Sequence, residues 1–486
     1  MRNPFAVGPG ALARLSTTRL GGEDRALLAA GLHSRRLVLL KSLQRRTEAG
    51  DTPPGERAEF ARHWRVLEDA ERCDPAAVRA VLGYPSVGVW LVDALEAPGP
   101  VGPRTLAHFG AVAAAAALRA RAGYRGTLDT PDGVLALPGI GVYRTRAPRV
   151  RLVAGPRSLR LTPEDGRPHT VPYAVPGQAP YAYGGGPAPD GTAPPVVPNG
   201  TPYGGGPRGR APYGPYGRAP YGRTVSRRAA PRAAPPGWSG LVPLPGTGAA
   251  LDGIDPYRLP APDSGPFSLL PPRRAPRPGA GEERWRRRWQ AALTLLASAD
   301  PGRALEVAAL VRALVPLEPG PGGASSATLR AAPWAVFTAC PPTALRLAEV
   351  LVHEIQHSKL AIVTDLVALY EGGDEPVHRV GWRPDPRPLA GVLQGTYAHL
   401  GLADLFHRLA ARPGAAPAAR RAARVRGDEC REQVADALRL LLRSGQLTPA
   451  GKEFAIGMRE HHTDLGRIGT AGDRTARRIL PIRYFR

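Results

Sequence analysis

Apolar residues recur at a helical period over several long stretches of the chain. Within Gly22–Arg46, leucines return every three or four residues, which is the period of one helix face. Further stretches of the same kind follow, and Pro301 divides the last of them into two helices. The helices expected from this pattern are 22–46, 75–82, 105–122 and 282–314.

Between the helical stretches, the pattern changes to short apolar runs separated by turn residues. Residues 128–161 contain two such runs, LDTPDGVLALPGIGVYRTR and RVRLVAG, with Pro-Asp-Gly as a turn. Residues 238–258, WSGLVPLPGTGAALDGIDPYR, are also predicted to form strands. We therefore expect a mainly α-helical fold with a small β element.

One segment follows neither pattern. Residues 175–236 repeat Pro-Tyr-Gly units, and Asp190 is their only acidic residue. Such a segment has almost nothing to bury, so we expect it to be disordered; the alternative is a Tyr/Arg segment that binds RNA or drives condensation. The predicted organisation is a helical region with the small β element at 1–174, the insertion at 175–236, and a second helical region at 237–486.

Residues 343–369 form the most strongly helical stretch of the sequence. Pro341 and Pro342 precede it, and Thr343 is a suitable N-cap. Apolar residues cover almost every side of this stretch, and a helix that is apolar all round lies inside a protein. We therefore expect it to be a buried helix in a helical core.

This helix carries LVHEIQHSKL at 351–360, which contains the pattern H-E-x-x-H. His353 and His357 are four residues apart, so their imidazoles share one helix face and suit two ligands of one metal ion. Buried ionisable groups need partners, and a metal ion is an efficient one. The alternative is a pair of core histidines that merely bond to their neighbours.

A third metal ligand has to come from another segment. Asp365 lies eight positions beyond His357, which is about 12 Å along a straight helix. Leu360 and Val363 stand where a metzincin peptidase carries glycine and its third histidine. His399, in the apolar segment GTYAHLGLADLF, is the preferred candidate, with a satisfied core histidine as the alternative. The other candidates are Glu371, Asp374, His378, Asp404 and His407.

Charge and cysteine content add two constraints. The chain has 65 Lys+Arg against 41 Asp+Glu, a formal net charge of +24, almost all of it from arginine. GC-rich codons are the simpler explanation, and a surface for polyanions is the alternative. The three cysteines, Cys73, Cys340 and Cys430, lie far apart in the sequence. No apolar run is long enough for a signal peptide or a membrane span. We expect a cytoplasmic protein without a membrane partner.

Three longer motifs are distinctive: LVHEIQHSKLAIVTDLVALYEGG, WRPDPRPLAGVLQGTYAHLGLADLF and LTPAGKEFAIGM. Together they resemble the HExxH-type peptide-modification family of bacterial ribosomal-peptide pathways. Upstream segments such as LPGIG, IDPYR and SSAT resemble that family's usual order, so the similarity covers nearly the whole chain apart from the insertion. The family is described as iron/2-oxoglutarate-dependent peptide β-hydroxylases and is often linked with radical-SAM maturation systems.

The resemblance implies an oxidoreductase, a dioxygenase that hydroxylates a ribosomally synthesised precursor peptide with Fe(II) and 2-oxoglutarate. In such a protein, His353 and His357 with His399 as the expected third ligand would hold Fe(II) and leave positions for the oxoacid and O₂. Glu354 would support the metal site without contacting the ion.

The resemblance also implies a site for the carboxylate of 2-oxoglutarate. That carboxylate needs a rigid, permanently charged fork, which arginine provides. Arg383 and Arg387, in the proline-rich GWRPDPRPL, are the candidates. The alternative is that both are surface residues paired with Asp385.

Two other functions stay open. The first is a zinc-dependent peptidase in which Glu354 activates water as a general base; the missing third-ligand signature argues against it. The second is a basic, non-enzymatic protein that binds nucleic acid through Arg and Tyr. That function leaves the buried histidine pair without a role, so a nucleic-acid partner is not expected.

Overall fold

The computed structural model describes residues 7–8, 10–49, 52–155, 158–173, 236–260, 281–319, 326–372 and 375–470, with side chains as far as 466. The predicted disordered insertion at 175–236 lies outside the described residues except for Pro236, and so does the candidate ligand Asp374. The described residues on both sides of the insertion belong to one compact unit.

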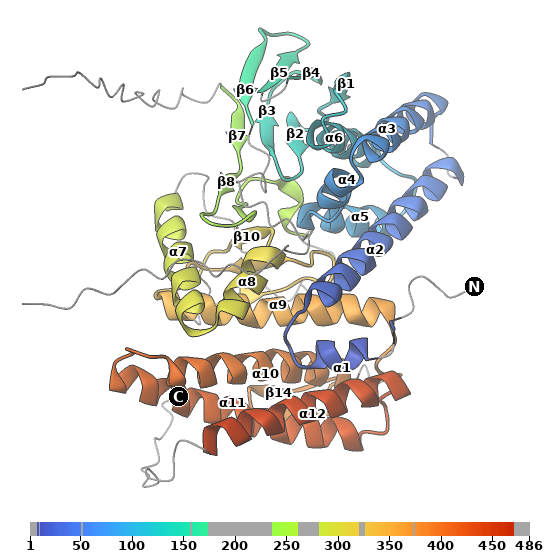
Figure 1. Cartoon of the computed structure of the whole chain (residues 1–486). Helices are drawn as coiled ribbons and strands as arrows, with labels where there is room; N and C mark the ends of the chain where they lie inside the picture. The colour runs from blue at the N-terminus through green and yellow to red at the C-terminus, as the bar shows by residue number, and fades with distance from the viewer. Residues whose placement is uncertain are drawn as a thin grey trace, which may run out of the picture. The chain divides into compact units, whose positions relative to one another are not determined.

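The described chain is mainly helical, as the hydrophobic pattern predicts (Figure 1). The predicted helices at 22–46, 75–82 and 105–122 are confirmed as α2, α4 and α6. Three further helices, α1, α3 and α5, were not expected. Proline in the first turn begins α3 and α5, where its missing N–H is not needed. The N-terminal helices are α1 (Ala11–Ser16), α2 (Gly22–Ala49), α3 (Pro54–Cys73), α4 (Pro75–Leu82), α5 (Pro85–Glu96) and α6 (Pro103–Arg119).

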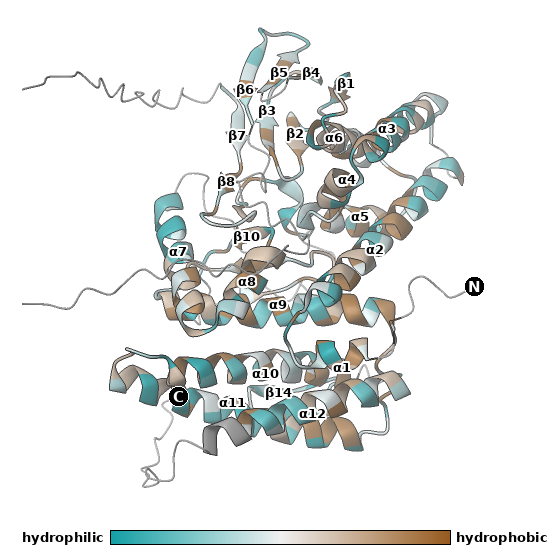
Figure 2. Ribbon diagram, viewed as in Figure 1, coloured by the Kyte–Doolittle hydropathy of each residue, from teal (hydrophilic) through white to brown (hydrophobic). Residues whose placement is uncertain are grey.

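The C-terminal part contains the remaining helices. Pro301 does separate two helices, and the Asp300 side chain caps the second by accepting the backbone N–H of Arg303. Figure 2 shows that the upper turns of α7 are mostly hydrophilic, and the first half of this helix carries its charged residues. The C-terminal helices are α7 (Glu282–Ala299), α8 (Pro301–Leu310), α9 (Ala344–Leu366), α10 (Leu389–Ala411), α11 (Pro417–Arg443) and α12 (Pro449–Thr470).

The expected β element is present and consists of two antiparallel sheets. One has the strand order β1-β4-β5-β6, and the other has the order β2-β3-β7. Their strands are β1 (Arg125–Asp129), β2 (Val134–Leu137), β3 (Gly141–Arg144), β4 (Arg149–Ala154), β5 (Ser158–Pro163), β6 (His169–Pro172) and β7 (Trp238–Gly240).

A third sheet was only partly expected. Its order is β11-β12-β10-β9-β8, and β10 runs parallel to both β9 and β12. The helix predicted as far as position 314 is wrong at its end, because α8 stops at Leu310 and β10 begins three residues later. The strands are β8 (Val242–Pro243), β9 (Ala250–Leu251), β10 (Ala313–Pro316), β11 (Ser326–Ala327) and β12 (Ala335–Thr338), and a separate hairpin pairs β13 (His378–Val380) with β14 (Arg383–Arg387).

Helix α9 lies in the core, as predicted. It packs against α10, α7 and α2 and against the sheet through β12. Thr343 is its N-cap and accepts the backbone N–H of Arg346 at 3.1 Å. On the sheet side, Ser358 Oγ accepts the backbone N–H of Trp334 at 3.2 Å, which fixes the helix against the start of β12.

Among the described residues, no single helix is long and apolar enough to cross a membrane; by length and composition alone, the bent pair α4–α5 passes that test together.

Candidate metal centre

The two histidines of the H-E-x-x-H pattern face each other on α9. The Nε2 atoms of His353 and His357 lie 3.0 Å apart, and the ring centroids are 4.6 Å apart at an interplanar angle of 82°. Both side chains are half-buried. Their meeting follows from the helical repeat, since residues four apart lie one above the other.

Helix α10 brings the preferred third candidate to this pair. The ring centroid of His399 lies 5.5 Å from that of His353, at an interplanar angle of 84°. Trp382, which precedes β14, stacks on the His399 ring at 4.5 Å and 20°. The stacking needs a glycine on α10, because a Cβ at Gly395 would lie 2.6 Å from the Trp382 ring. The structure thus assembles His353, His357 and His399 from segments far apart in the sequence.

Hydrogen bonds at Nδ1 orient two of the three rings. His357 Nδ1 donates to Gln394 Oε1 at 3.0 Å, and His399 Nδ1 donates to the carbonyl of Gly395 at 2.8 Å. Both acceptors are oxygens, so each ring carries its proton on Nδ1 and presents an Nε2 lone pair. This is the arrangement that metal-bound histidines use, with the second nitrogen held by an amide or carbonyl oxygen.

The surroundings favour the neutral form of two of the rings, His353 and His399. Burial lowers the pKa of His353 well below its ordinary value, and the neighbouring charges of His357 and His399 act in the same direction. Burial also lowers the pKa of His399 to about 4, although the Gly395 carbonyl opposes the shift. A neutral imidazole is the form that binds a metal ion.

The donor set therefore fits a metal ion that accepts imidazole nitrogen, and Fe(II) and Zn(II) both do so. Among the described residues, no group of three His, Cys, Asp or Glu side chains is close enough together to hold one metal ion without a change of position. The facing Nε2 atoms of His353 and His357 supply two ligand positions, and His399 is the adjacent imidazole.

Glu354 has a different set of partners from the histidines. Ser326 Oγ donates to one carboxylate oxygen and Thr328 Oγ1 to the other, each at 2.6 Å. The Glu354 side chain is buried, with 2% exposed. Because Ser326 belongs to β11, this carboxylate ties α9 to the edge of the sheet.

The two arginines expected to bind an oxoacid lie on β14. Arg383 and Arg387 both donate to Asp385, at 3.1 Å and 3.2 Å. The side chains are 49% and 37% exposed. This is the surface arrangement that the sequence left open as the alternative.

The other candidate ligands lie elsewhere. Glu371 is exposed, and its backbone N–H donates to the carbonyl of Gln446. His378 is on β13, where it pairs in register with Arg387 of β14. His407 is half-buried on α10.

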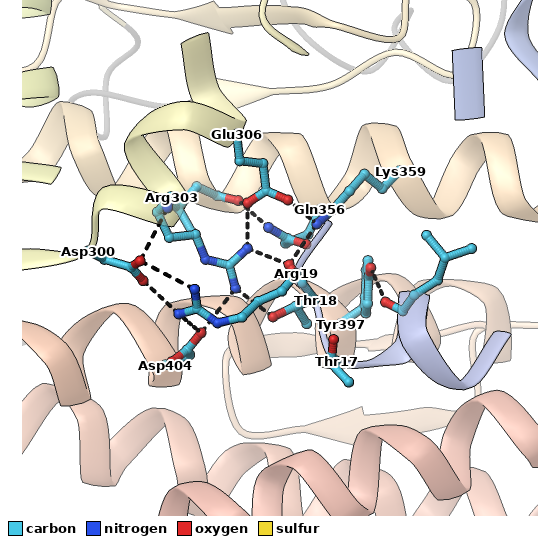
Figure 3. A network of polar contacts seen from close by, with 12 residues as sticks. Thr17, Thr18, Arg19, Asp300, Arg303, Glu306, Gln356, Lys359, Tyr397 and Asp404 are labelled. Carbon is cyan, nitrogen blue, oxygen red and sulfur yellow. Dashed lines mark hydrogen bonds and ion pairs between the residues drawn. The ribbon is translucent and has the colours of Figure 1, made fainter. Parts of the chain in front are cut away.

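Asp404 belongs to a buried ionic network that joins α8, α9 and α10 (Figure 3). It is fully buried and accepts from Arg303 at 3.2 Å and from Arg408 at 3.2 Å, and it also pairs with Arg19. Although burial acts to raise the pKa of Asp404, these arginines lower it overall. Asp404 lies five residues after His399, so its direction on α10 differs by about 140°. It is an ion-pair residue of the core.

The same network includes Lys359 of α9. Lys359 Nζ donates to Glu306 Oε1 at 2.6 Å and to the carbonyl of Thr18 at 2.7 Å, and Arg303 donates to Glu306 Oε2 at 2.6 Å. Thr18 has a positive φ of 61°, an unfavourable conformation for threonine. The two cations thus fix the turn between α1 and α2 against α8 and α9, as Figure 3 shows.

Several residues of the site were not anticipated from the sequence. Gln394 and Trp382 lie inside the motif that contains His399, so the motif signalled their segment but not their contacts. Ser326 and Thr328 belong to SSAT, a segment quoted for the resemblance without a role. No periodicity connects these residues to α9, since only the folded chain brings them together.

Compared with models of known protein families and with curated protein sequences, the chain matches none.

Proposed function

We propose that this protein is an Fe(II)/2-oxoglutarate-dependent hydroxylase that modifies a ribosomally synthesised precursor peptide. The observation that carries the proposal is the facing Nε2 pair of His353 and His357, with His399 beside it. In His357 and His399, a hydrogen bond at Nδ1 holds the ring, and the Nε2 of His357 faces that of His353. Histidine rings that are oriented through Nδ1 and gathered from two helices suit a metal ion.

Each residue of the site has a separate task in this proposal. His353, His357 and His399 would hold the iron, which with 2-oxoglutarate supplies the oxidising power to hydroxylate a C–H bond. Gln394 holds His357 in the ligand tautomer by accepting its Nδ1 proton. Trp382 covers one face of the His399 ring and limits the access of water to it.

A peptide substrate is supported by the sheet edge beside the site. Strand β11 ends its sheet among the described residues, and its Ser326 bonds to Glu354 on the metal-site helix. An extended peptide adds to a sheet edge through main-chain hydrogen bonds and needs no particular side chains to do so. A precursor peptide bound along β11 would pass next to α9. From the resemblance, its pathway would also include a radical-SAM enzyme.

The geometry favours hydroxylation over peptide hydrolysis. In an H-E-x-x-H peptidase, the glutamate takes a proton from water, so at least one carboxylate oxygen must face that water. Here the Glu354 side chain is buried, with 2% exposed, and its carboxylate points to the hydroxyls of Ser326 and Thr328. The role that fits Glu354 is to hold α9 against β11.

The test is a reaction of the purified protein with the short precursor peptide encoded beside its gene. With Fe(II), 2-oxoglutarate and O₂, the peptide should gain the mass of one oxygen, and one succinate should form per modified peptide. His353→Ala and His357→Ala should each abolish iron binding and the mass gain, while His378→Ala should retain both. Peptide fragments formed with Zn(II) and without 2-oxoglutarate would instead establish the peptidase.

A further inference from the structure

A hollow lies at the start of the metal-site helix. It has a volume of about 570 Å³ and opens to solvent. Its charged side chains are two guanidiniums and one carboxylate, so the lining carries a net positive charge. The residues that line it are Pro342, Thr343, Leu345, Arg346, Glu349 and Arg426.

The hollow continues the helix face that carries the histidines. On an α-helix, Arg346, Glu349, His353 and His357 follow one another at spacings of three or four residues, so their side chains share one face. Glu349 precedes His353 by about 6 Å along the axis, and Arg346 precedes it by about 10.5 Å. Helical side chains all lean toward the N-terminus, so this axial order is kept among the side chains.

Two helices supply the arginines. Arg346 comes from the first turns of α9, whereas Arg426 comes from α11, which packs along α10. The two guanidiniums therefore reach the same hollow from different helices.

Each guanidinium keeps most of its donors available. Arg346 Nη1 donates to Glu349 at 2.5 Å, and Arg426 Nη1 donates to Glu429 at 2.6 Å. Arginine has five N–H donors, so each side chain can bind a further carboxylate while its glutamate holds it in place. The side chains are 48% and 46% exposed, so a small ligand from solvent can reach them.

We propose that Arg346 and Arg426 bind the distal carboxylate of 2-oxoglutarate, a task that the sequence had suggested for Arg383 and Arg387. The inference rests on the proposed function. In an extended five-carbon diacid, the two carboxylate carbons are four C–C bonds apart, or roughly 5 Å, which is close to one helical turn. Its oxoacid end would lie at the histidines, and its distal carboxylate would extend along the α9 face into the hollow. Arg383 and Arg387, by contrast, share Asp385 on an exposed hairpin.

The experiment measures ligand binding and does not depend on turnover. Protein loaded with Fe(II) in the absence of O₂ is titrated calorimetrically with 2-oxoglutarate and with 2-oxobutanoate, which lacks the distal carboxylate. Arg346→Gln and Arg426→Gln should each weaken 2-oxoglutarate binding by roughly 10- to 100-fold, the effect of losing one charge-assisted hydrogen bond. The affinity for 2-oxobutanoate should stay nearly the same, because that ligand has no distal carboxylate to contact the arginines.

A matched control is available on the same helix. Arg439 of α11 pairs with Asp436 three residues earlier, and both side chains are exposed. Arg439→Gln therefore removes an ion pair of the same type away from the hollow and should leave both titrations unchanged. Iron content measured on every sample separates a loss of metal from a loss of oxoacid binding.

Three outcomes would overturn the inference while leaving the proposed function intact. The first is a loss of 2-oxoglutarate affinity in Arg383→Gln or Arg387→Gln with none in the two hollow variants. The second is an equal loss for both oxoacids. The third is weakened binding of the precursor peptide with unchanged 2-oxoglutarate binding, which would assign the hollow to the peptide. If the iron-loaded wild-type protein binds no 2-oxoglutarate, the proposed function itself fails, and this inference fails with it.

Discussion

Replacing Gln394 with leucine tests how the histidine pair is prepared for a metal ion. Gln394 Oε1 lies 3.0 Å from His357 Nδ1 and is the acceptor that keeps the ring proton there. Leucine is similar in size but has no acceptor, so the proton becomes free to move to Nε2. That atom faces Nε2 of His353 at 3.0 Å. The substitution therefore acts on metal affinity, because the ion must then displace a proton or turn the ring.

The size of the effect follows from the kind of contact that is lost. Removing the hydrogen-bond partner of a metal-binding histidine lowers metal affinity by about 10- to 100-fold, or roughly 1.4 to 2.8 kcal/mol. The metal-free protein should lose less, about 1 kcal/mol, because the bond is between neutral groups and the site is only half-buried. Metal binding should thus be affected more strongly than folding.

The assay is a competition titration of Fe(II) against a chelator without O₂, together with urea unfolding of the metal-free protein. Gln394→Glu keeps an acceptor and should bind iron at least as tightly as the wild-type protein. Gln44→Leu removes a glutamine on α2 that bonds to Lys41 and Glu48 of its own helix, and it should change neither measurement. Wild-type iron affinity in Gln394→Leu would refute the claim that this side chain orients His357.

Three other predictions concern different parts of the chain. His399→Ala should lose bound iron, whereas Asp404→Ala should keep its iron per folded molecule. Asp404→Ala should instead lower the free energy of unfolding by about 3–5 kcal/mol, because a buried ionic network loses a partner. Iron loss in Asp404→Ala alone would reverse the ligand assignment. Burial lowers the pKa of His108 from 6.5 to about 3, so the unfolded chain binds more protons than the folded chain between these pH values. The free energy of unfolding of the metal-free protein should therefore fall as the pH drops from 6.5. In His108→Phe, this free energy, measured by urea unfolding, should fall less steeply with pH. Deleting residues 175–236 should leave the Tm and iron content nearly unchanged, since their composition offers little to bury; a large loss of folded protein would show the opposite.

Features that depend on neighbouring residues could be predicted from the sequence. The apolar character of 343–369 on all sides indicated a buried helix, and Thr343 was identified as its cap. The facing of His353 and His357 follows from a spacing of four on that helix. Pro301 was predicted to separate two helices because proline cannot continue one. In each case, the chain within a few turns supplies the physical cause.

Strands of the third sheet could not be predicted in the same way. Residues 313–316, Ala-Leu-Val-Pro, are buried at every position and form the parallel strand β10. A short apolar run has no alternation to distinguish it from the end of a buried helix. Parallel pairing joins segments far apart in the chain, so its partners β9 and β12 leave no local signal.

The contacts that give the site its chemistry were decided by the tertiary structure. Whether His399 or Asp404 would accompany the histidine pair depends on which side of α10 faces α9, and the sequence supplied only a preference. The partners of Glu354 come from β11, and the acceptor for His357 comes from α10. Hydrogen bonds between separate elements depend on how those elements pack, and packing is a property of the whole fold. The sequence alone therefore determined the helix and its two histidines, while the folded chain determined the side chains that hold, orient and surround them.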